Sequence, residues 1–306
     1  MKYDIIGDIH GHVVPLMELL KKLEYYDKNG YYQHAEGRRV IFVGDFIDRG
    51  PNIRETLQLV KDMVDHGTAE SVMGNHEYNA ICFYLKDKVN GGYLRKHRFK
   101  NITQHFETIK QFASHEKEWQ GWIEWFIQLP LFIEKEKLRI VHACWDDELI
   151  KHLKTITTGN RLPVDVIYGA QERGTKDYEA IERTLKGKET TLPNNLFFLD
   201  KDGHKRTETR TKWWMNAEGL DYNDYFFFET AELENQKIKH GEMTDNNFYA
   251  DDQVPVFFGH YWLRGEPVLQ KPNVVCLDYS IAKEGELVAY RFNGESKLRK
   301  ENFFVV

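Results

Sequence analysis

The sequence contains little cysteine, no long apolar run and no excess of positive charge. Its three cysteines, Cys82, Cys144 and Cys276, lie far apart and form neither a disulfide framework nor a CxxC pair, which favours a reducing compartment. No apolar stretch is long enough to cross a bilayer, and the N-terminal segment meets polar residues too early for a secretory signal. We therefore expect a cytoplasmic protein that does not bind a membrane.

The charge balance excludes a strongly basic protein. Lysine and arginine total 42 against 48 aspartates and glutamates, which gives a net charge of -6. No overall positive field would draw the chain to nucleic acid, although a local basic patch remains possible. With 306 residues, 41% of them hydrophobic, the chain is long enough for one large globular domain. We expect a single domain over residues 1–306.

Strand-like and helix-like patterns alternate in the first third of the chain. Apolar residues recur at helical spacing over Val13–Tyr26 and Ile53–His66, and short apolar runs precede or follow them. Such alternation favours an α/β fold. The predicted strands are Tyr3–Ile6, Val40–Val43, Ser71–Met73, Leu138–Val141, Val254–Phe258, Val274–Leu277 and Leu287–Phe292, the last two as a closing hairpin.

The pattern loosens between about residues 146 and 252, where charged and turn-forming residues interrupt it. We interpret this range as a cap insertion beside the strand ends. It carries Arg206 and Arg210 close to Trp213 and Trp214, a mixture that could hold a nucleotide or a second phosphate. The alternative interpretation is that these residues form a solvated turn without a role in binding. The hypothesis is that Arg206 or Arg210 binds substrate over the active site.

Five of the predicted strands are followed by residues capable of binding metal or phosphate. In α/β sheets, ligands bind outside the carboxyl ends of the strands. A single histidine after a strand is usually a hydrogen-bonded structural residue, but five such coincidences indicate a common site. The side chains, strand by strand, are Asp8 and His10; Asp45, Asp48 and Arg49; Asn75, His76 and Glu77; His142; and His260.

Six of these side chains form a mixed set of nitrogen and oxygen donors without thiolate. Such a set suits Mn, Fe or Zn in a catalytic site better than a closed structural zinc site, and we expect Mn. Six ligands exceed what one catalytic ion needs, so two ions bridged by one carboxylate fit better. A hydroxide bridging the ions could attack phosphorus in a bound phosphate ester. The six are Asp8, His10, Asp45, Asn75, His142 and His260.

The remaining side chains suit the other steps of phosphoester cleavage. His76 could protonate the leaving oxygen. Asp48 could orient the His76 ring and keep that ring protonated. Arg49 could clamp phosphate with two hydrogen bonds.

The blocks G-D-I-H-G, G-D-F-I-D-R-G and G-N-H-E, followed by His142 and His260, closely resemble the phosphoprotein phosphatase family of calcineurin-like metallophosphoesterases. The resemblance covers residues 1–80 and the strands around the two histidines. It implies a four-layer α-β-β-α sandwich and phosphoester hydrolysis. It also implies that Asp45 bridges two ions. One ion would be held with Asp8 and His10, the other with Asn75, His142 and His260, and His76, Asp48 and Arg49 would keep the roles given above.

The chain departs from the family pattern next to these blocks. Met73 stands where eukaryotic members carry arginine, Ala143 and Cys144 replace two glycines, and Tyr261 follows His260 where many members have a second histidine. Three substrate classes therefore stay open. They are phosphorylated serine or threonine in proteins, which the family name favours, dinucleoside polyphosphates of the Ap4A type, and nucleotide or nucleic-acid phosphoesters. A non-catalytic scaffold is the rival interpretation, and the complete ligand set argues against it.

Overall fold

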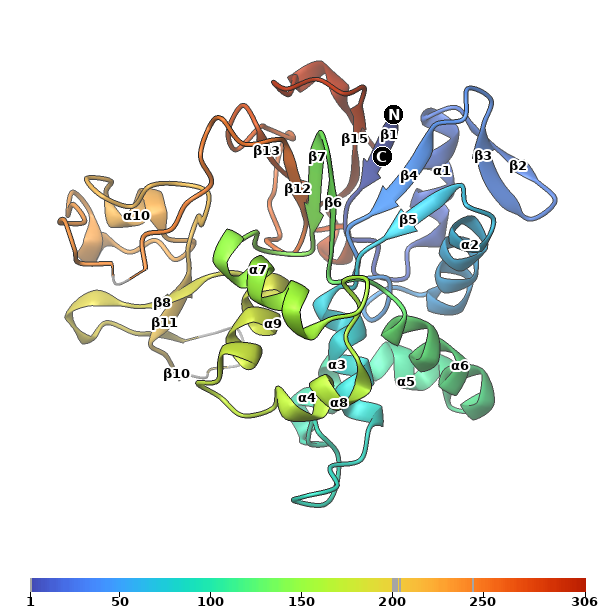
Figure 1. The fold of residues 1–306 in the computed structure, drawn as a ribbon, viewed down its shortest axis with the longest axis horizontal. Helices are drawn as coiled ribbons and strands as arrows, with labels where there is room; N and C mark the ends of the chain where they lie inside the picture. The colour runs from blue at the N-terminus through green and yellow to red at the C-terminus, as the bar shows by residue number, and fades with distance from the viewer. Residues whose placement is uncertain (1, 200–202, 204, 244) are drawn as a thin grey trace.

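Two β-sheets face each other at the centre of the molecule (Figure 1). The computed structural model describes residues 2–199, 203, 205–243 and 245–306. The first sheet runs in the order β14 (Asp278–Tyr279), β15 (Glu286–Phe292), β1 (Tyr3–Ile6), β4 (Arg39–Phe42) and β5 (Ala69–Ser71), with β16 (Phe303–Val305) beside β15. The second runs β13 (Val274–Cys276), β12 (Val256–Phe258), β7 (Leu138–Val141) and β6 (Phe132–Lys135).

Alternation along the strands divides the apolar side chains between two cores. In and just after β1 and β4, Ile5, Ile41 and Val43 belong to the core between the two sheets, where they meet Ile140 and Phe257 of the second sheet. The neighbouring positions, such as Ile6 and Phe42, belong to the core under the helices. Both faces of these strands are buried, which is why they read as continuous apolar runs.

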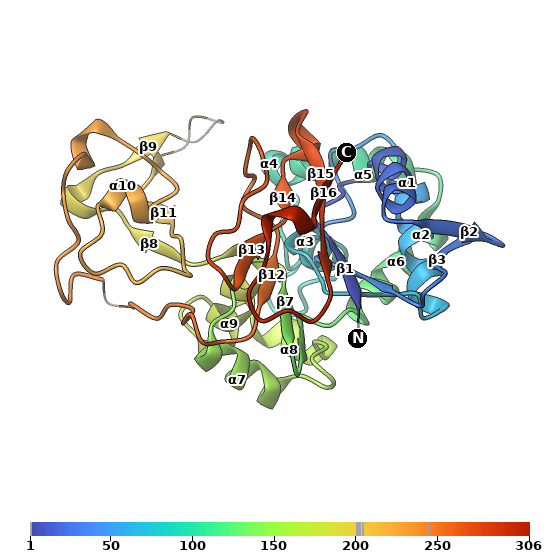
Figure 2. The same cartoon turned by 90° about the horizontal axis from the view of Figure 1, so that it is seen from above.

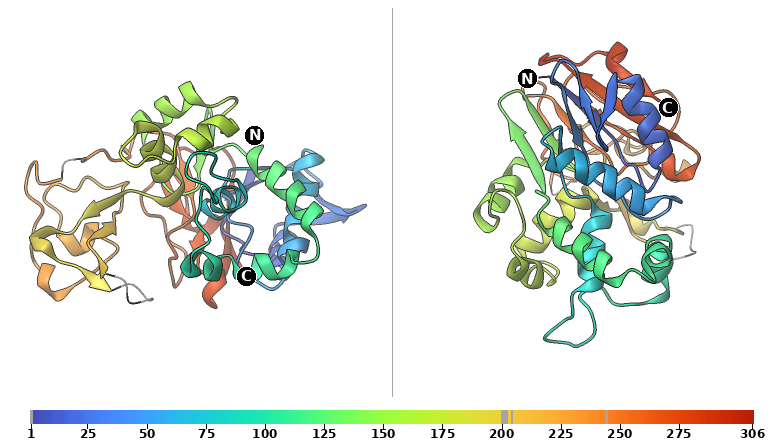
Figure 3. Two further views of the ribbon diagram at one scale, coloured as in Figure 1. Left: turned by 90° about the horizontal axis from the view of Figure 1, so that it is seen from below. Right: turned by 90° about the vertical axis from the view of Figure 1, so that its right-hand side faces the viewer.

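Helices cover the outer faces of both sheets. The buried residues of α1 (Val13–Lys22) and α2 (Ile53–Asp65) recur every three or four positions, as an amphipathic helix requires, and pack on the first sheet. α7 (Asp147–Ile156) and α9 (Lys176–Lys186) pack together beside the second sheet and share its apolar core. The right-hand view of Figure 3 shows α1 and α2 in front of the first sheet. The predicted four-layer α-β-β-α sandwich is confirmed.

Further helices surround the lower end of the sandwich in Figure 1. They are α3 (Asn75–Tyr84), α4 (Phe99–Gln104), α5 (Phe106–Phe112), α6 (Glu116–Ile127) and α8 (Val164–Gly169). A hairpin of β2 (Tyr25–Lys28) and β3 (Tyr31–His34) follows α1, so the helix predicted over Val13–Tyr26 ends early. The predicted closing hairpin is wrong: β13 pairs with β12 in the second sheet, and β15 pairs with β14.

A small lobe stands outside the sandwich (Figure 2). In it β8 (Glu189–Thr191) pairs with β11 (Glu208–Arg210), β9 (Phe198–Leu199) pairs with β10 (Lys205–Arg206), and α10 (Tyr222–Tyr225) follows. The lobe has its own apolar cluster, built from Leu192, Tyr222, Phe226, Leu233 and their neighbours. The range 146–252 therefore contains two different parts, since α7 and α9 belong to the main core and the lobe does not. Residues 200–202, 204 and 244 of this range lie outside the described residues.

Candidate active site

Five strand ends bring the predicted site residues together. β1, β4 and β5 are parallel neighbours in one sheet, and β7 and β12 are parallel neighbours in the other, so the carboxyl ends of each set meet at one edge. All six proposed ligands follow these strands, and all six are buried. They are Asp8, His10, Asp45, Asn75, His142 and His260.

Asp45 lies at the centre of the cluster. Its Oδ2 is 3.6 Å from Nε2 of His10 and 3.4 Å from Nε2 of His142, while its Oδ1 accepts a hydrogen bond of 2.9 Å from the backbone N–H of His76. One carboxylate oxygen thus faces histidines from both halves of the cluster. This is the arrangement expected of a carboxylate that bridges two ions.

The second half of the cluster gathers around Asn75, the first residue of α3. Its Oδ1 is 3.1 Å from Nε2 of His142 and 2.7 Å from Nδ1 of His260. Potential ligand atoms of Asp45, His142 and His260 lie within 4.8 Å of one another. Ligands about 2.0–2.2 Å from a common ion must lie close together in this way.

Several buried polar atoms in the cluster have no hydrogen-bond partner in the described structure, and these atoms test whether a metal fits. They are Oδ1 of Asp8, Nε2 of His10 and Nε2 of His260. The Nδ1 atoms of His10 and His142 each lie within 2.9 Å of a backbone carbonyl, so Nδ1 carries the proton and Nε2 is free to bind a metal. Buried polar atoms rarely remain unpaired. The residues present therefore fit divalent ions.

Electrostatics favour the neutral imidazole at His10 and His260 and the charged carboxylate at Asp45. Burial, together with the charge of the nearby His76, lowers the pKa of His10 to about 4. Burial and the charge of Arg210 also lower the pKa of His260. Burial alone would raise the pKa of Asp45, but the charges of His142 and His76 outweigh it and hold that pKa well below its usual value. Metal binding needs these protonation states.

His76 and Asp48 form a buried pair beside the cluster. Nδ1 of His76 is 2.5 Å from Oδ2 of Asp48, and Nε2 of His76 is 3.9 Å from Oδ2 of Asp45. The imidazole is therefore held at one nitrogen and presents the other to the proposed metal cluster. Burial opposes protonation of His76, but Asp45 and the bond to Asp48 raise its pKa. A histidine held in this way can donate a proton from Nε2.

Two further residues hold Asp48, and the sequence patterns did not identify them. His105 donates from Nδ1 to Oδ1 of Asp48 at 2.7 Å, and the hydroxyl of Thr108 donates to the same oxygen at 2.5 Å. Both residues are buried. They lie between α4 and the start of α5 and follow no strand, so no motif pointed to them.

Glu77 joins the loops after β4 and β5. Its carboxylate accepts hydrogen bonds of 2.8 to 2.9 Å from the backbone N–H groups of Asp45, Phe46 and Gly74. Gly74 is needed where these loops meet, because a Cβ atom there would lie 2.2 Å from Oδ1 of Asp45. Burial and the charge of Asp45 raise the pKa of Glu77 to about 7, against the effect of its N–H donors.

The three predicted arginines lie in different surroundings. Arg49 is near the cluster, since its charge lowers the pKa values of His10 and His76. Arg210 approaches from the lobe, and its Nη1 is 3.4 Å from the carbonyl oxygen of His260. Arg206 is exposed on β10. The structure thus brings Arg49 and Arg210 to the predicted site.

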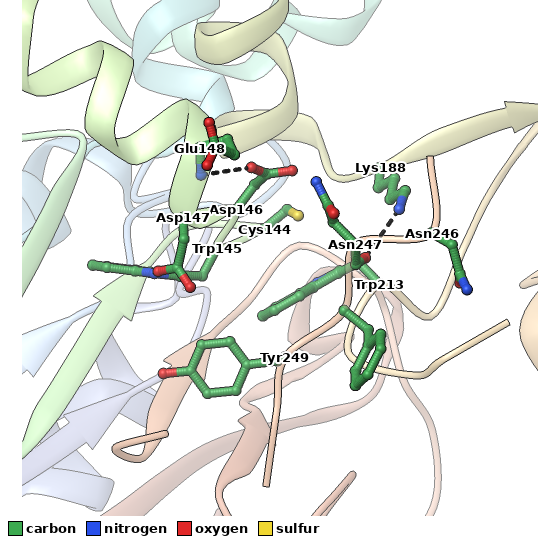
Figure 4. A pocket seen from close by; sticks show the side chains of 11 residues that line it. Cys144, Trp145, Asp146, Asp147, Glu148, Lys188, Trp213, Asn246, Asn247 and Tyr249 are labelled. Carbon is green, nitrogen blue, oxygen red and sulfur yellow. Dashed lines mark hydrogen bonds between the residues drawn. The ribbon is translucent and has the colours of Figure 1, made fainter. Parts of the chain in front are cut away.

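A cavity of about 280 Å³ lies elsewhere, between α7 and residues 246–249 (Figure 4). Trp145, Trp213 and Tyr249 line it together with Asp146 and Lys188, and none of the six proposed ligands does. Donor chemistry, rather than the volume of this cavity, therefore locates the candidate site.

The comparisons with known proteins agree with this chemistry. The family model described as calcineurin-like phosphoesterase matches residues 1–261. The chain belongs to the calcineurin-like phosphoesterase family. The resemblance found in the sequence blocks is thereby confirmed, and the observed cluster of histidine and aspartate side chains offers candidate ligands for the binuclear metal site of that family.

Among the relatives are bacterial proteins named bis(5'-nucleosyl)-tetraphosphatase PrpE. The protein of Oceanobacillus iheyensis is 34% identical over 152 residues, which are 49% of this chain and 59% of that protein. The protein of Halalkalibacterium halodurans is 37% identical over 175 residues, 55% of this chain and 65% of that protein. In both cases the match spans less than two thirds of the relative.

A solved structure described as a protein serine/threonine phosphatase from Saccharomyces cerevisiae matches 100% of this chain and 79% of its own, with a TM-score of 0.50 and 14% identity. At that identity the likeness shows the fold alone. In the part of the chain that the structure describes, no helix has the length and apolar character needed to span a membrane.

Proposed function

We propose that this protein is a two-metal phosphoesterase that hydrolyses dinucleoside polyphosphates of the Ap4A type. The observation that carries the reaction class is two groups of potential metal-binding side chains that share Asp45. One adds His10 and His76, the other adds His142 and His260, and Nε2 of His76 is 3.9 Å from Oδ2 of Asp45. The names of the two PrpE relatives support the nucleotide substrate over the phosphoprotein expected first from the family name. Phosphorylated serine or threonine in proteins is the second candidate, since the fold is shared with a protein phosphatase.

The metals would be held by residues on both sides of Asp45. We propose Asp8, His10 and Asp45 for one ion and Asp45, Asn75, His142 and His260 for the other, with Mn as the expected metal and Fe or Zn as alternatives. When bound, two divalent ions neutralise the charge of a phosphate and supply a nucleophilic water.

The chain's own side chains would complete the reaction. Arg49 binds phosphate oxygens by its guanidinium, because it lies near His10 and His76. His76 gives the proton on Nε2 to the leaving phosphate oxygen, while Asp48 holds Nδ1 and stabilises the charged ring. Arg210 is proposed to contact the substrate from the lobe, and Arg206 remains a weaker proposal because it is exposed on β10.

The cap insertion is proposed as part of one domain over residues 1–306. Within the range 146–252, we assign the cap role to the lobe of residues 189–243, since it has its own apolar cluster and carries Arg210. α7 and α9 belong instead to the sandwich.

The test compares three substrates in the presence of Mn²⁺: diadenosine tetraphosphate, a phosphoserine peptide and p-nitrophenyl phosphate. The wild type should cleave the dinucleotide with the highest kcat/KM, and Asp45→Asn should abolish that activity together with most bound metal. A higher kcat/KM on the phosphopeptide would replace the nucleotide proposal with the second candidate. Metal loading without turnover of any of the three would indicate a cap that admits only a specific substrate, whereas no turnover and no bound metal would favour the scaffold interpretation.

A further inference from the structure

Trp262 has an unusual backbone conformation beside the candidate active site. It follows the proposed ligand His260 by two residues and has a φ of 53°, in the left-handed region that bulky side chains rarely adopt. Its backbone N–H donates a hydrogen bond of 2.7 Å to Oδ2 of the buried Asp278, which holds this conformation. Strained residues fixed by their surroundings concentrate at functional sites. The backbone conformation of Trp262 therefore suggests that its ring has a role in function.

Two cations lie close to the indole ring. The guanidinium carbon of Arg49 is 5.6 Å from the ring centroid, and Nζ of Lys283 is 3.5 Å from it. Arg49 is the proposed phosphate-binding residue, and its charge reaches His10 and His76 in the cluster. The ring of Trp262 is thus next to the residue that is proposed to bind phosphate.

The exposure of these residues decides what the ring can bind. Trp262 is only partly buried, and Lys283 is exposed on a long flexible side chain. A lysine over an exposed aromatic ring contributes roughly two- to five-fold to an equilibrium, whereas a nucleobase stacked on the same ring contributes roughly 5- to 150-fold. A base can therefore displace the ammonium group from the ring.

We propose that Trp262 is the stacking platform for the nucleobase of the nucleotide whose phosphate Arg49 binds. This inference rests on the proposed function and narrows it to substrates that carry a base next to the reacting phosphate. Trp262 contacts the substrate and determines specificity in this scheme, and the base takes the place of Lys283 on the ring. A phosphate ester without an aromatic group would bind through Arg49 and the metals alone.

The experiment measures binding of two ligands that differ only by the base. Isothermal titration calorimetry of the Mn²⁺-loaded protein is performed with AMP and with ribose 5-phosphate, in the His76→Asn background so that turnover is slow. AMP should bind at least five-fold more tightly than ribose 5-phosphate. Trp262→Ala should remove this difference and leave the affinity for ribose 5-phosphate unchanged, and Trp262→Phe should keep part of it.

Three results would overturn the inference. Equal affinity for AMP and ribose 5-phosphate in the protein that keeps Trp262 would exclude any base contact. This measurement does not depend on how the Trp262 variants fold. An AMP preference that survives in Trp262→Ala would place the base elsewhere. An equal loss for both ligands would mean that Trp262 only positions Arg49. Hydrolysis of diadenosine tetraphosphate by the wild type is measured separately, so a failure of the platform is distinguished from a failure of the proposed function.

Discussion

His76 is held at Nδ1 by Asp48 and presents Nε2 to the candidate metal centre. We predict that His76→Asn keeps its metals, because His76 is not among the proposed ligands, but lowers kcat about 10²–10⁴-fold on a substrate with a poor leaving group. The loss should be much smaller on an activated ester such as p-nitrophenyl phosphate, whose leaving oxygen needs no proton. Steady-state kinetics on phenyl and p-nitrophenyl phosphate, with metal analysis, make the comparison. Equal losses on both esters would contradict the acid role.

His105 acts one step further from the reaction, through Asp48. We predict that His105→Leu lowers kcat on poor leaving groups roughly ten- to a hundred-fold, the kinetic equivalent of one hydrogen bond to a charged group at about 1.5–3 kcal/mol. As with His76, the loss should shrink on the activated ester, which a general loss of packing would not explain.

His97 offers a matched control for this variant. His97 stacks on Phe83, whose ring also contacts His105, but its hydrogen bond goes to the backbone oxygen of Phe83 and not to Asp48. His97→Leu should therefore leave both rates nearly unchanged. If it reproduces the losses of His105→Leu, the effect comes from packing and the positioning role is wrong.

The difference between His105 and the proposed ligands shows what sequence can reveal at the scale of residues. Asp8, Asp45, His142 and His260 could be predicted because each follows a recognisable strand. His105 lies 57 residues from Asp48 between two short helices, and only folding brings it within 2.7 Å of that carboxylate. No local sequence pattern could have predicted this contact.

At the scale of elements, the turn between β5 and α3 packs closely against the loop after β4. A Cβ atom at Gly74 would lie 2.3 Å from the backbone nitrogen of Asp45 and 2.6 Å from Oε2 of Glu77. We predict that Gly74→Ala displaces Asp45, so that the folded protein binds metal at least ten-fold more weakly and loses most activity. Metal titration followed by calorimetry would measure the change.

Gly121 in α6 provides the matched glycine variant. A Cβ atom there has no neighbour within 4 Å, and the residue lies inside a helix. Gly121→Ala should keep metal affinity and stabilise the protein by about 0.5–1 kcal/mol. Normal metal binding in Gly74→Ala would show that the loop adapts and that the close approach is not essential.

The elements themselves were predictable where burial is continuous. The strands at Tyr3–Ile6 and Leu138–Val141 and the helix from Ile53 were predicted within one residue, because their apolar residues face a core on one or both sides. The pairing of β13 was not predictable. Its partner β12 is in the other sheet, and a local reading of the sequence favours a hairpin with the next strand along the chain.

At the scale of the whole molecule, the sandwich follows from its periodic apolar residues, but the division of the range 146–252 does not. Loose patterning predicted one cap, whereas α7 and α9 bury their apolar faces, through Leu149, Leu153 and Ile181, in the main core. The lobe around Tyr222 and Phe226 is built from short elements that gain their order from one another. The two parts are distinguished only by contacts between residues far apart in the sequence, which local patterns do not show.

The proposed metal centre would join both sheets, so its occupancy should affect the stability of the entire sandwich. The charged form of the buried Asp8 is unfavourable without a cation, since burial and the nearby Asp278 and Asp45 raise its pKa well above the usual value. Each site filled at about 100 times its Kd adds roughly 2.7 kcal/mol to the free energy of unfolding. We predict that chelation lowers the Tm by at least about 5 °C. In Asp45→Asn, which lacks the bridging charge, Mn²⁺ should raise the Tm far less than in the wild type. Differential scanning calorimetry with and without chelator tests both variants, and a wild-type Tm indifferent to Mn²⁺ would contradict a centre that couples the two sheets.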